Sequence, residues 1–440
     1  MLLPVAYASA QDQAAEIAEL RRLVVELRAD YEARIGDLEA RLAQAERAAR
    51  GAERDAGEAI ELAEQVAIDQ APGASAPNTF NPAIGAILDG GYSDIGVGWD
   101  EIPGFQPAGE IGAGEPGFSI GELELNLQAN IDTRYYGNVT LGIHDDEGEI
   151  ELEVEEAWLQ TTQMPAGLQV VAGRFFSEAG YLNQFHFHAD DFVDRPLPYQ
   201  AFYGGRYTVD GVRARWLAPT NLLVEVGTEL DWGAGFPATA NGDRSPGAYS
   251  IYANVGGDIG LSHSWMAGLS HTETDAVDRV AGHGHEEIPG EEPDAFTGDS
   301  DLTVFDFVWK WAPGGNNSNR NFKFQGEYFR RSERGVFGPA DYEGDQAGWY
   351  VQGVWQFAPA WRAGLRHDGV DADNIVSIPG TELDDPGRNA YRDSLMFDWS
   401  PSEFSRLRLQ YTRDNVLDIA DDQWYLQYIM SIGAHPAHQF

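Results

Sequence analysis

The sequence predicts an all-β transmembrane barrel of about sixteen antiparallel strands, preceded by an α-helical coiled coil. Three observations carry this prediction. Apolar residues between positions 12 and 70 recur at the spacing of a coiled coil. From residue 80 onward the apolar period changes to two, which is the period of a strand with one buried face. The connections between these alternating segments are short and long in turn, as in barrels that cross a membrane.

Composition argues against several classes of protein. The 440 residues include 71 acidic and 29 basic side chains, a formal net charge of -42, and no cysteine. We expect no nucleic-acid partner, because phosphate binding requires Lys and Arg. The lack of Cys excludes a disulfide framework, a thiolate metal site and a Cys nucleophile. We also expect no enzyme, since the sequence has neither a Gly-Lys-Ser phosphate loop nor a nucleophile with a positioned base.

The chain begins with a segment that predicts export. Residues 1–10 are apolar and end in Ala8-Ser9-Ala10, which has the small-residue pattern of a signal-peptide cleavage site. We therefore interpret residues 1–10 as the remnant of a signal peptide. No run of eighteen apolar residues occurs in the sequence, so it predicts no transmembrane helix.

Residues 11–70 predict the coiled coil. The segment is rich in Ala, Glu and Arg, and its seam begins with Ile17, Leu20, Val24 and Leu27. Charged residues occupy the remaining positions, which favours self-association over a single amphipathic helix lying on a globular body. Residues 71–80 contain Pro and Gly, end the helical pattern and predict a linker.

Residues 81–440 predict the barrel. The clearest alternation runs from Glu122 to Ile131, and a second begins at Glu149 and changes phase near Glu156, as a β-bulge would cause. A soluble β-sandwich or a β-helix is the competing fold, but this many strands would exceed one sandwich. The expected short turns lie near residues 131–133, 163–167, 218–221, 256–258, 313–316, 358–360 and 401–403. The expected long loops are residues 93–117, 177–205, 233–246, 272–300, 332–346, 368–390 and 414–421.

Several segments resemble a known family. The strand Glu155-Glu156-Ala157-Trp158, followed by Ala172-Gly173-Arg174-Phe175-Phe176, is similar to the region before the constriction loop of trimeric DcaP-like and phosphate-selective porins. Other segments resemble Gram-negative outer-membrane proteins labelled zinc-regulated TonB-dependent receptors. These segments are Asn81-Pro82-Ala83-Ile84, Gly180-Tyr181-Leu182-Asn183, Ser400-Pro401-Ser402-Glu403 and the ending Gly433-Ala434-His435 to Phe440. The resemblance implies a bacterial outer-membrane trimer with its coiled coil in the periplasm.

A plugged receptor does not fit this sequence. Such a transporter needs a plug domain before a barrel of about 22 strands. The residues that precede the first predicted strand read instead as a coiled coil. We therefore expect an unplugged barrel whose two ends lie on the periplasmic side.

Alternation predicts which charged side chains face the lumen. If the leucines of a strand face lipid, the residues between them line the pore. The predicted pore-lining residues are Glu122, Glu124, Glu149, Glu151, Glu153, Arg174, Arg213, Arg215, Arg366, Arg406 and Arg408. Two interpretations remain open: acidic and basic walls could create a field across the channel, or the charges could neutralise each other in pairs. The excess of acids favours cations over anions. The alternative is that the excess acids lie on external loops, where they would bridge lipopolysaccharide through divalent cations.

Two histidine clusters predict contacts with metal ions. His186, His188 and Asp190 lie two residues apart, so an extended backbone would place them on one side of the loop. Such a set suits zinc or another divalent cation. His283, His285 and Glu286 form a looser tract in a predicted external loop. We expect no required cofactor and only transient binding of the ion; polar loops without metal are the alternative.

The predicted function is passive diffusion of small hydrophilic solutes through an outer-membrane porin, with a preference for cations or divalent metal ions. The expected partners are further copies of the chain, forming a trimer through the coiled coil and the barrel, together with outer-membrane lipid and lipopolysaccharide. The alternative is a non-conducting anchor that binds metal or surface partners and is tethered through the periplasmic coiled coil.

Overall fold

The computed structural model describes Arg22 and residues 82–106, 111–146, 149–233, 235–237, 245–280, 295–385 and 387–433. The predicted signal remnant, coiled coil and linker therefore lie outside the described residues. So does the His283, His285 and Glu286 tract.

The strands are β1 (Ala83–Asp94), β2 (Gly117–Asn130), β3 (Tyr135–Asp146), β4 (Glu149–Thr161), β5 (Leu168–Phe176), β6 (Thr208–Leu217), β7 (Leu223–Asp231), β8 (Ala248–Ile259), β9 (His263–Arg279), β10 (Phe296–Trp311), β11 (Asn321–Phe337), β12 (Ala340–Ala358), β13 (Trp361–Asp371), β14 (Ala390–Ser402), β15 (Ser405–Asp414) and β16 (Asp421–Gly433).

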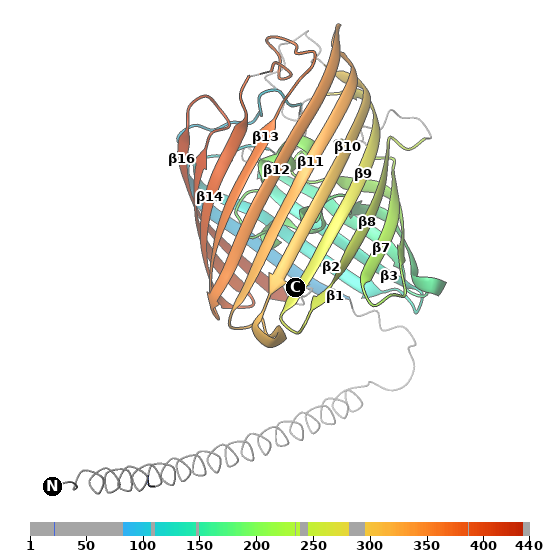
Figure 1. Cartoon of the computed structure of the whole chain (residues 1–440), viewed down its shortest axis with the longest axis vertical. Coiled ribbons are helices and arrows are strands. Elements are labelled where there is room, and N and C mark those ends of the chain that lie inside the picture. The colour runs from blue at the N-terminus through green and yellow to red at the C-terminus, as the bar shows by residue number, and fades with distance from the viewer. Residues whose placement is uncertain are drawn as a thin grey trace, which may run out of the picture. The chain divides into compact units, whose positions relative to one another are not determined.

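These described strands form one closed antiparallel barrel of sixteen strands, which confirms the predicted barrel (Figure 1). Each strand pairs with its neighbours in sequence, and β1 closes the barrel by pairing with β16. The first residues of β1 pair with the last of β16, Gly85 opposite Gly433, so both ends of the barrel lie at one rim. A closed barrel leaves no unpaired sheet edge, which is the condition for a sheet in lipid.

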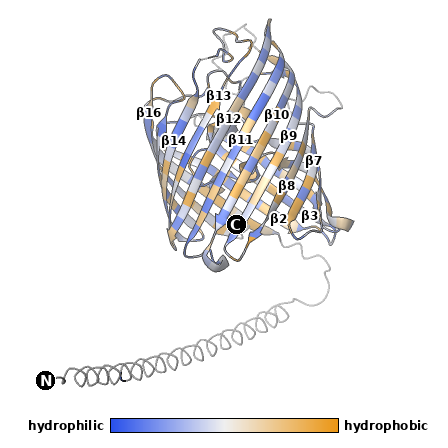
Figure 2. Cartoon of the chain, in the orientation of Figure 1, coloured by the Kyte–Doolittle hydropathy of each residue, from blue (hydrophilic) through white to orange (hydrophobic). Residues whose placement is uncertain are grey.

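The strands carry polar side chains on the inside of the barrel and apolar side chains on the outside, the reverse of a water-soluble protein. On β14, Tyr391, Leu395 and Phe397 are exposed on the outside, whereas Arg392 and Asp398 are buried on the inside. Figure 2 shows hydrophilic and hydrophobic residues alternating along the strands. A polar interior with an apolar exterior is stable where the outer face meets lipid. No described helix is long and apolar enough to cross a membrane.

Most expected connections agree with the structure, but residues 332–346 do not form a long loop. They belong to β11 and β12, which continue to a turn between Phe337 and Ala340. Ion pairs across the outer face join Arg330 to Asp345 at 2.7 Å and Arg334 to Glu343. Opposite charges facing one another stabilise paired strands, so this polar segment extends as a hairpin.

The loop between β5 and β6 lies inside the barrel. We call residues 177–207 the inner loop; it contains η2 (Leu182–Gln184), η3 (Phe187–Ala189) and α2 (Leu197–Tyr203), and α2 contacts β11, β12 and β13. Two further short helices, η1 (Pro165–Gly167) and η4 (Pro313–Gly315), lie in turns. The largest buried apolar cluster joins α2 to the wall and to the loop before β2. It includes Ile102, Phe105, Leu197, Tyr199, Phe202, Tyr203, Phe329 and Tyr350.

Gly173 allows β4 and β5 to approach each other just before the inner loop. Its φ angle is +126°, and a Cβ atom there would lie 2.2 Å from the carbonyl oxygen of Ala157. We expect Gly173→Ala to destabilise the barrel by about 1–3 kcal/mol, because the side chain forces both backbone strain and strand separation. Urea unfolding in detergent micelles measures the change. Gly98→Ala is the matched control, since a Cβ atom at Gly98 meets no atom within 4 Å; equal midpoints for the two variants would contradict the expectation.

Candidate functional site

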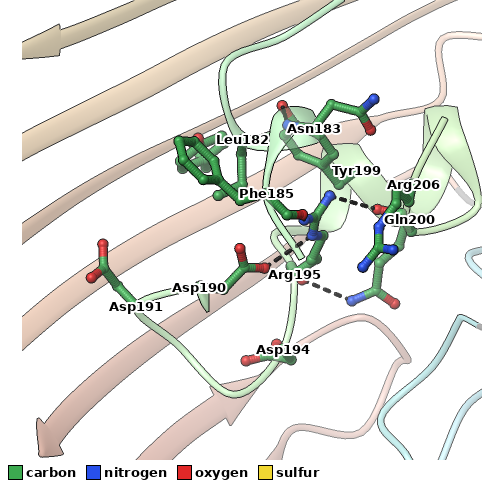
Figure 3. A network of polar contacts seen from close by, with 12 residues as sticks. Leu182, Asn183, Phe185, Asp190, Asp191, Asp194, Arg195, Tyr199, Gln200 and Arg206 are labelled. Atoms are coloured by element: carbon green, nitrogen blue, oxygen red, sulfur yellow. Dashed lines mark hydrogen bonds and ion pairs between the residues drawn. The ribbon is translucent and has the colours of Figure 1, made fainter. Parts of the chain in front are cut away.

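Arg195 organises the inner loop from within (Figure 3). Its Nε donates to Asp190 Oδ2 at 2.9 Å and its Nη1 to the carbonyl oxygen of Gly205 at 3.3 Å. Its own carbonyl oxygen accepts a 2.9 Å hydrogen bond from Gln200 Nε2. Pro196 is the N-cap of α2, Pro198 lies in its first turn, and Gly204, with φ +60°, ends it. These contacts fix the two halves of the loop against each other.

Glu327 on β11 anchors the loop to the wall. Its carboxylate accepts from the backbone N–H groups of Tyr181 at 3.1 Å and Leu182 at 3.0 Å. It also accepts from the hydroxyl groups of Tyr199 at 2.9 Å and Tyr350 at 2.6 Å. Burial raises the pKa of Tyr199 well above its ordinary value, so this hydroxyl remains a donor at neutral pH.

Two aspartates of the loop reach a basic wall. Asp191 pairs with Lys323 and, at 3.0 Å, with Arg362. Burial raises the pKa of Asp191, but these cations outweigh that effect and hold the pKa below its ordinary value. Asp194 pairs with Arg366 at 2.9 Å and Arg392 at 2.6 Å. In Figure 3 both carboxylates point away from Arg195.

The pKa of Asp194 follows the same pattern as that of Asp191. Burial raises it, whereas Arg366 and Arg392 lower it more strongly, to about 2. Both aspartates are therefore ionised at neutral pH and hold the loop electrostatically. Lys323, Arg362 and Arg392 were not among the predicted residues, although each occupies an inward position of an alternating strand.

On the side of β2 and β4, the loop meets carboxylates through two histidines. His186 Nδ1 lies 3.2 Å from Glu124 Oε2 and 3.4 Å from Glu155 Oε2, and its Nε2 lies 3.2 Å from Glu156 Oε2. His188 Nδ1 lies 2.9 Å from Glu124 Oε2. Burial lowers the pKa of His186, but the three carboxylates outweigh burial and hold the pKa well above its ordinary value.

A bulge on β4 explains why two consecutive glutamates face this cluster. The register against β3 shifts between the pairs Thr140–Glu156 and Leu141–Val154, so Glu155 is the extra residue. A bulge turns two successive side chains toward one face, which alternation alone forbids. The predicted change of phase near Glu156 is therefore present, one residue earlier. Arg206 Nη1 donates to Glu155 Oε1 at 2.6 Å and fixes that carboxylate.

The predicted pore-lining glutamates divide into three groups. Glu122 and Glu124 lie on the inner face of β2. Glu151 and Glu153 share the inner face with His144 and Gly142 of β3, and both are exposed. The side chain of Glu149 lies outside the described residues.

The predicted arginines face the interior with one exception. Arg213 pairs with Glu229 at 2.7 Å, and Arg215 lies 3.5 Å from Glu225. Arg408 donates to Gln427 at 3.1 Å. The last two, Arg366 and Arg406, contact the inner loop, Arg366 through Asp194 and Arg406 through the carbonyl oxygens of His188 and Asp190. The contacts of Arg213, Arg215 and Arg366 fit the interpretation in which acidic and basic side chains neutralise each other in pairs.

The prediction for Arg174 was wrong. Arg174 lies on the outer face of β5, where it pairs with Asp210 at 2.7 Å and donates to the carbonyl oxygen of Val154. Its neighbour Phe175 takes the inner face, beneath the guanidinium of Arg213. The phase is set by pairing with β6, in which Val171 lies opposite the inward-facing Arg213.

The predicted set of His186, His188 and Asp190 was partly wrong. The two imidazoles do lie together, stacked at 5.6 Å between ring centroids. Asp190 turns away and pairs with Arg195, because the chain forms the 3₁₀ turn η3 where an extended backbone was expected. Glutamates of the barrel wall take its place.

Comparisons with solved structures define the fold class. The chain superimposes on the outer membrane channel DcaP of Acinetobacter baumannii with a TM-score of 0.51 and 14% identity, over 80% of this chain and 97% of that one. An anion-selective porin from Comamonas acidovorans gives 0.51 and 9%, over 80% and 99%. A loop-deletion mutant of OmpT of Vibrio cholerae gives 0.50 and 10%, over 80% and 99%. The fold is thus that of a porin-like outer-membrane β-barrel.

A sequence relative defines the family. The chain is 30% identical over 395 residues to an uncharacterized protein of Aquifex aeolicus (strain VF5), covering 82% of this chain and 80% of the relative. The chain belongs to the family of that protein. No protein-family profile matches it. These structural neighbours are 9–14% identical to the chain and therefore show its fold alone.

Proposed function

We propose that this chain forms a passive outer-membrane channel for small hydrophilic solutes, in which the inner loop sets the constriction. One observation carries the proposal: a closed barrel of sixteen described strands holds a loop inside it that is tied to its wall by buried polar contacts. A barrel of this strand number is wide enough for an aqueous channel unless something fills it. The loop therefore controls the free cross-section.

We propose a preference for cations. Near the inner loop, Glu122, Glu124, Glu155 and Glu156 gather on the side of β2 and β4. Among the described residues, Arg206 is the only permanently charged base that forms an ion pair with one of these four carboxylates. On the opposite side, around β11 to β15, most of the inward-facing basic residues pair with Asp191, Asp194, Asp368 and Asp398. Arg406 instead contacts backbone carbonyl oxygens of the inner loop. An excess of negative charge in a narrow passage concentrates cations.

Assembly as a trimer, anchoring in lipopolysaccharide and tethering through the coiled coil belong to the same proposal.

Conductance across a planar bilayer tests this function. We expect discrete steps and a reversal potential in a salt gradient that reports cations. Glu122→Gln together with Glu124→Gln should move that potential toward zero, because acidic groups are removed from the lumen. Asp345→Asn is the matched control, since it removes a carboxylate from the outer face, where Asp345 pairs with Arg330. An unchanged potential in the double variant would contradict cation selection by this wall.

The burial of the inner loop favours a second candidate function. Every residue of α2 is buried, and the loop contacts both β2 and β11, which lie on different sides of the barrel. A loop held this firmly supports a closed barrel that acts as an anchor. Folded protein that inserts into bilayers without any conductance would overturn the channel and favour the anchor.

A further inference from the structure

We propose that the inner loop and the barrel wall together form a binding site for one divalent transition-metal ion of the zinc class, with Glu124, Glu155 and His186 as ligands and His188 as a fourth donor. The site links the loop to β2 and β4. It differs from the set that sequence spacing suggested, because two of its ligands come from the wall.

The first argument is the convergence of buried atoms. Glu124, Glu155 and His186 each offer a ligand atom, and these atoms lie within 4.8 Å of one another. His186 Nδ1 lies 3.2 Å from Glu124 Oε2 and 3.4 Å from Glu155 Oε2. Among the described residues, none of the three atoms has a hydrogen bond of acceptable geometry. The side chains of Glu124 and Glu155 are only 5% and 6% exposed, so water does not easily satisfy them. Buried polar atoms without hydrogen bonds are costly, and a cation bound among these three would remove that cost.

The second argument concerns the two nitrogen atoms of His186. Its Nε2 lies 3.2 Å from Glu156 Oε2, and an ionised carboxylate can only accept, so Nε2 carries the hydrogen. In neutral imidazole the lone pair then lies on Nδ1, which faces Glu124 and Glu155. Three electron-rich atoms therefore meet, and a cation must lie among them: a second proton on the ring or a metal ion.

The position of Glu156 fits the metal. A ligating histidine commonly donates its other N–H to a carboxylate, which orients the ring and strengthens the ligand. Glu156 is itself fixed, because Trp158 Nε1 donates to Oε1 at 2.9 Å and Asn138 Nδ2 to Oε2 at 3.2 Å. The imidazole is thus held with Nδ1 toward Glu124 and Glu155 before any ion binds.

The distances between donor atoms fit tetrahedral coordination. Zinc–nitrogen and zinc–oxygen bonds of roughly 2.0–2.2 Å place neighbouring tetrahedral ligands about 3.3 Å apart. Here the separations are 3.2 Å and 3.4 Å from His186 Nδ1 to the two carboxylates. His188 Nδ1 lies 2.9 Å from Glu124 Oε2, close enough to complete the set with small movements.

Donor type and charge select the ion. Imidazole nitrogen favours zinc and its first-row neighbours over magnesium or calcium, which prefer oxygen alone. Two ligating carboxylates and Glu156 together outweigh the single guanidinium of Arg206 on Glu155, so two positive charges are better balanced than one.

Metal binding to the purified full-length protein tests the site directly. After treatment with a chelator, the protein is titrated with Zn²⁺ by calorimetry and with Co²⁺ in visible spectroscopy, where tetrahedral coordination gives characteristic absorption. We expect Glu124→Gln and His186→Ala each to lose one bound equivalent relative to wild type. The nearly isosteric Glu124→Gln keeps the test valid if His186→Ala does not fold, and heat-dependent migration on gels reports folding.

The control is His271→Ala. His271, Glu273 and Asp301 form a second group with donors within 4.8 Å of one another, on the more exposed outer face. We expect this variant to retain the equivalent that Glu124→Gln loses. Equal Zn²⁺ stoichiometry and equal Co²⁺ spectra in wild type and in folded Glu124→Gln would overturn the proposal and leave His186 as a protonated partner of the carboxylates.

The consequence for transport rests on the proposed channel. An ion that joins the loop to the wall should change single-channel conductance in wild type and not in Glu124→Gln. Binding is measured without any current, so a barrel that binds Zn²⁺ but never conducts would refute the channel alone, and a conducting barrel without binding would refute the site alone.

Discussion

Asp191→Ala is expected to detach the inner loop from the basic wall and to destabilise the barrel by about 3–5 kcal/mol. The carboxylate is 4% exposed and pairs with both Lys323 and Arg362, which are themselves about three-quarters buried. Among the described residues, Asp191 is the only ion-pair partner of Lys323, so the substitution leaves this mostly buried ammonium group without a counter-charge. Uncompensated buried charge is what makes the loss large, since an exposed pair contributes less than about 1 kcal/mol.

The exposed pair in the same barrel supplies the comparison. Asp345→Ala breaks the contact with Arg330, whose side chain is 61% exposed, and should shift the free energy of unfolding only slightly. Urea unfolding gives both energies, and trypsin cleavage after Arg206 reports whether the loop has been released. If Asp191→Ala and Asp345→Ala have equal unfolding midpoints and neither is cleaved faster than wild type, Asp191 does not hold the loop.

The alternation of polar and apolar residues predicted the barrel, because a sheet with water on one face and lipid on the other requires it. On β2 every second residue faces inward, so the inward position of Glu124 was readable from the sequence. Alternation failed at β5, where the run Val170-Val171-Ala172 contains no polar marker and Gly173 adopts a left-handed φ angle. The phase of Arg174 there depends on pairing with β6, which the sequence does not reveal.

The candidate site was predictable only in part, for a similar reason. The spacing of His186 and His188 indicated that two imidazoles would meet. Their partners come from β2 and β4, and they meet the loop only once the barrel has closed around it. The bulge at Glu155 adds a second obstacle, because it places a side chain inside that a regular strand would turn outward.

Glu327→Ala is expected to have an effect of the same size through hydrogen bonds. The side chain of Glu327 is buried, and its two oxygens accept from the N–H groups of Tyr181 and Leu182 and from the hydroxyls of Tyr199 and Tyr350. Each buried donor left without an acceptor costs about 1–3 kcal/mol, so we expect a total loss on the order of 4 kcal/mol after partial relaxation.

The replacement by glutamine separates charge from hydrogen bonding at the same position. Glu327→Gln keeps one accepting oxygen but directs an amide N–H group toward donors, so it should recover only part of the stability. The control is Glu343→Ala, which removes a carboxylate whose partner, Arg334, is 78% exposed. The unfolding midpoint should be highest for Glu343→Ala, lower for Glu327→Gln and lowest for Glu327→Ala. The rate of tryptic cleavage after Arg206 should increase in the same sequence of variants. A midpoint for Glu327→Ala equal to that of Glu343→Ala would mean that the loop is held by apolar packing around Phe202 and Phe329 instead.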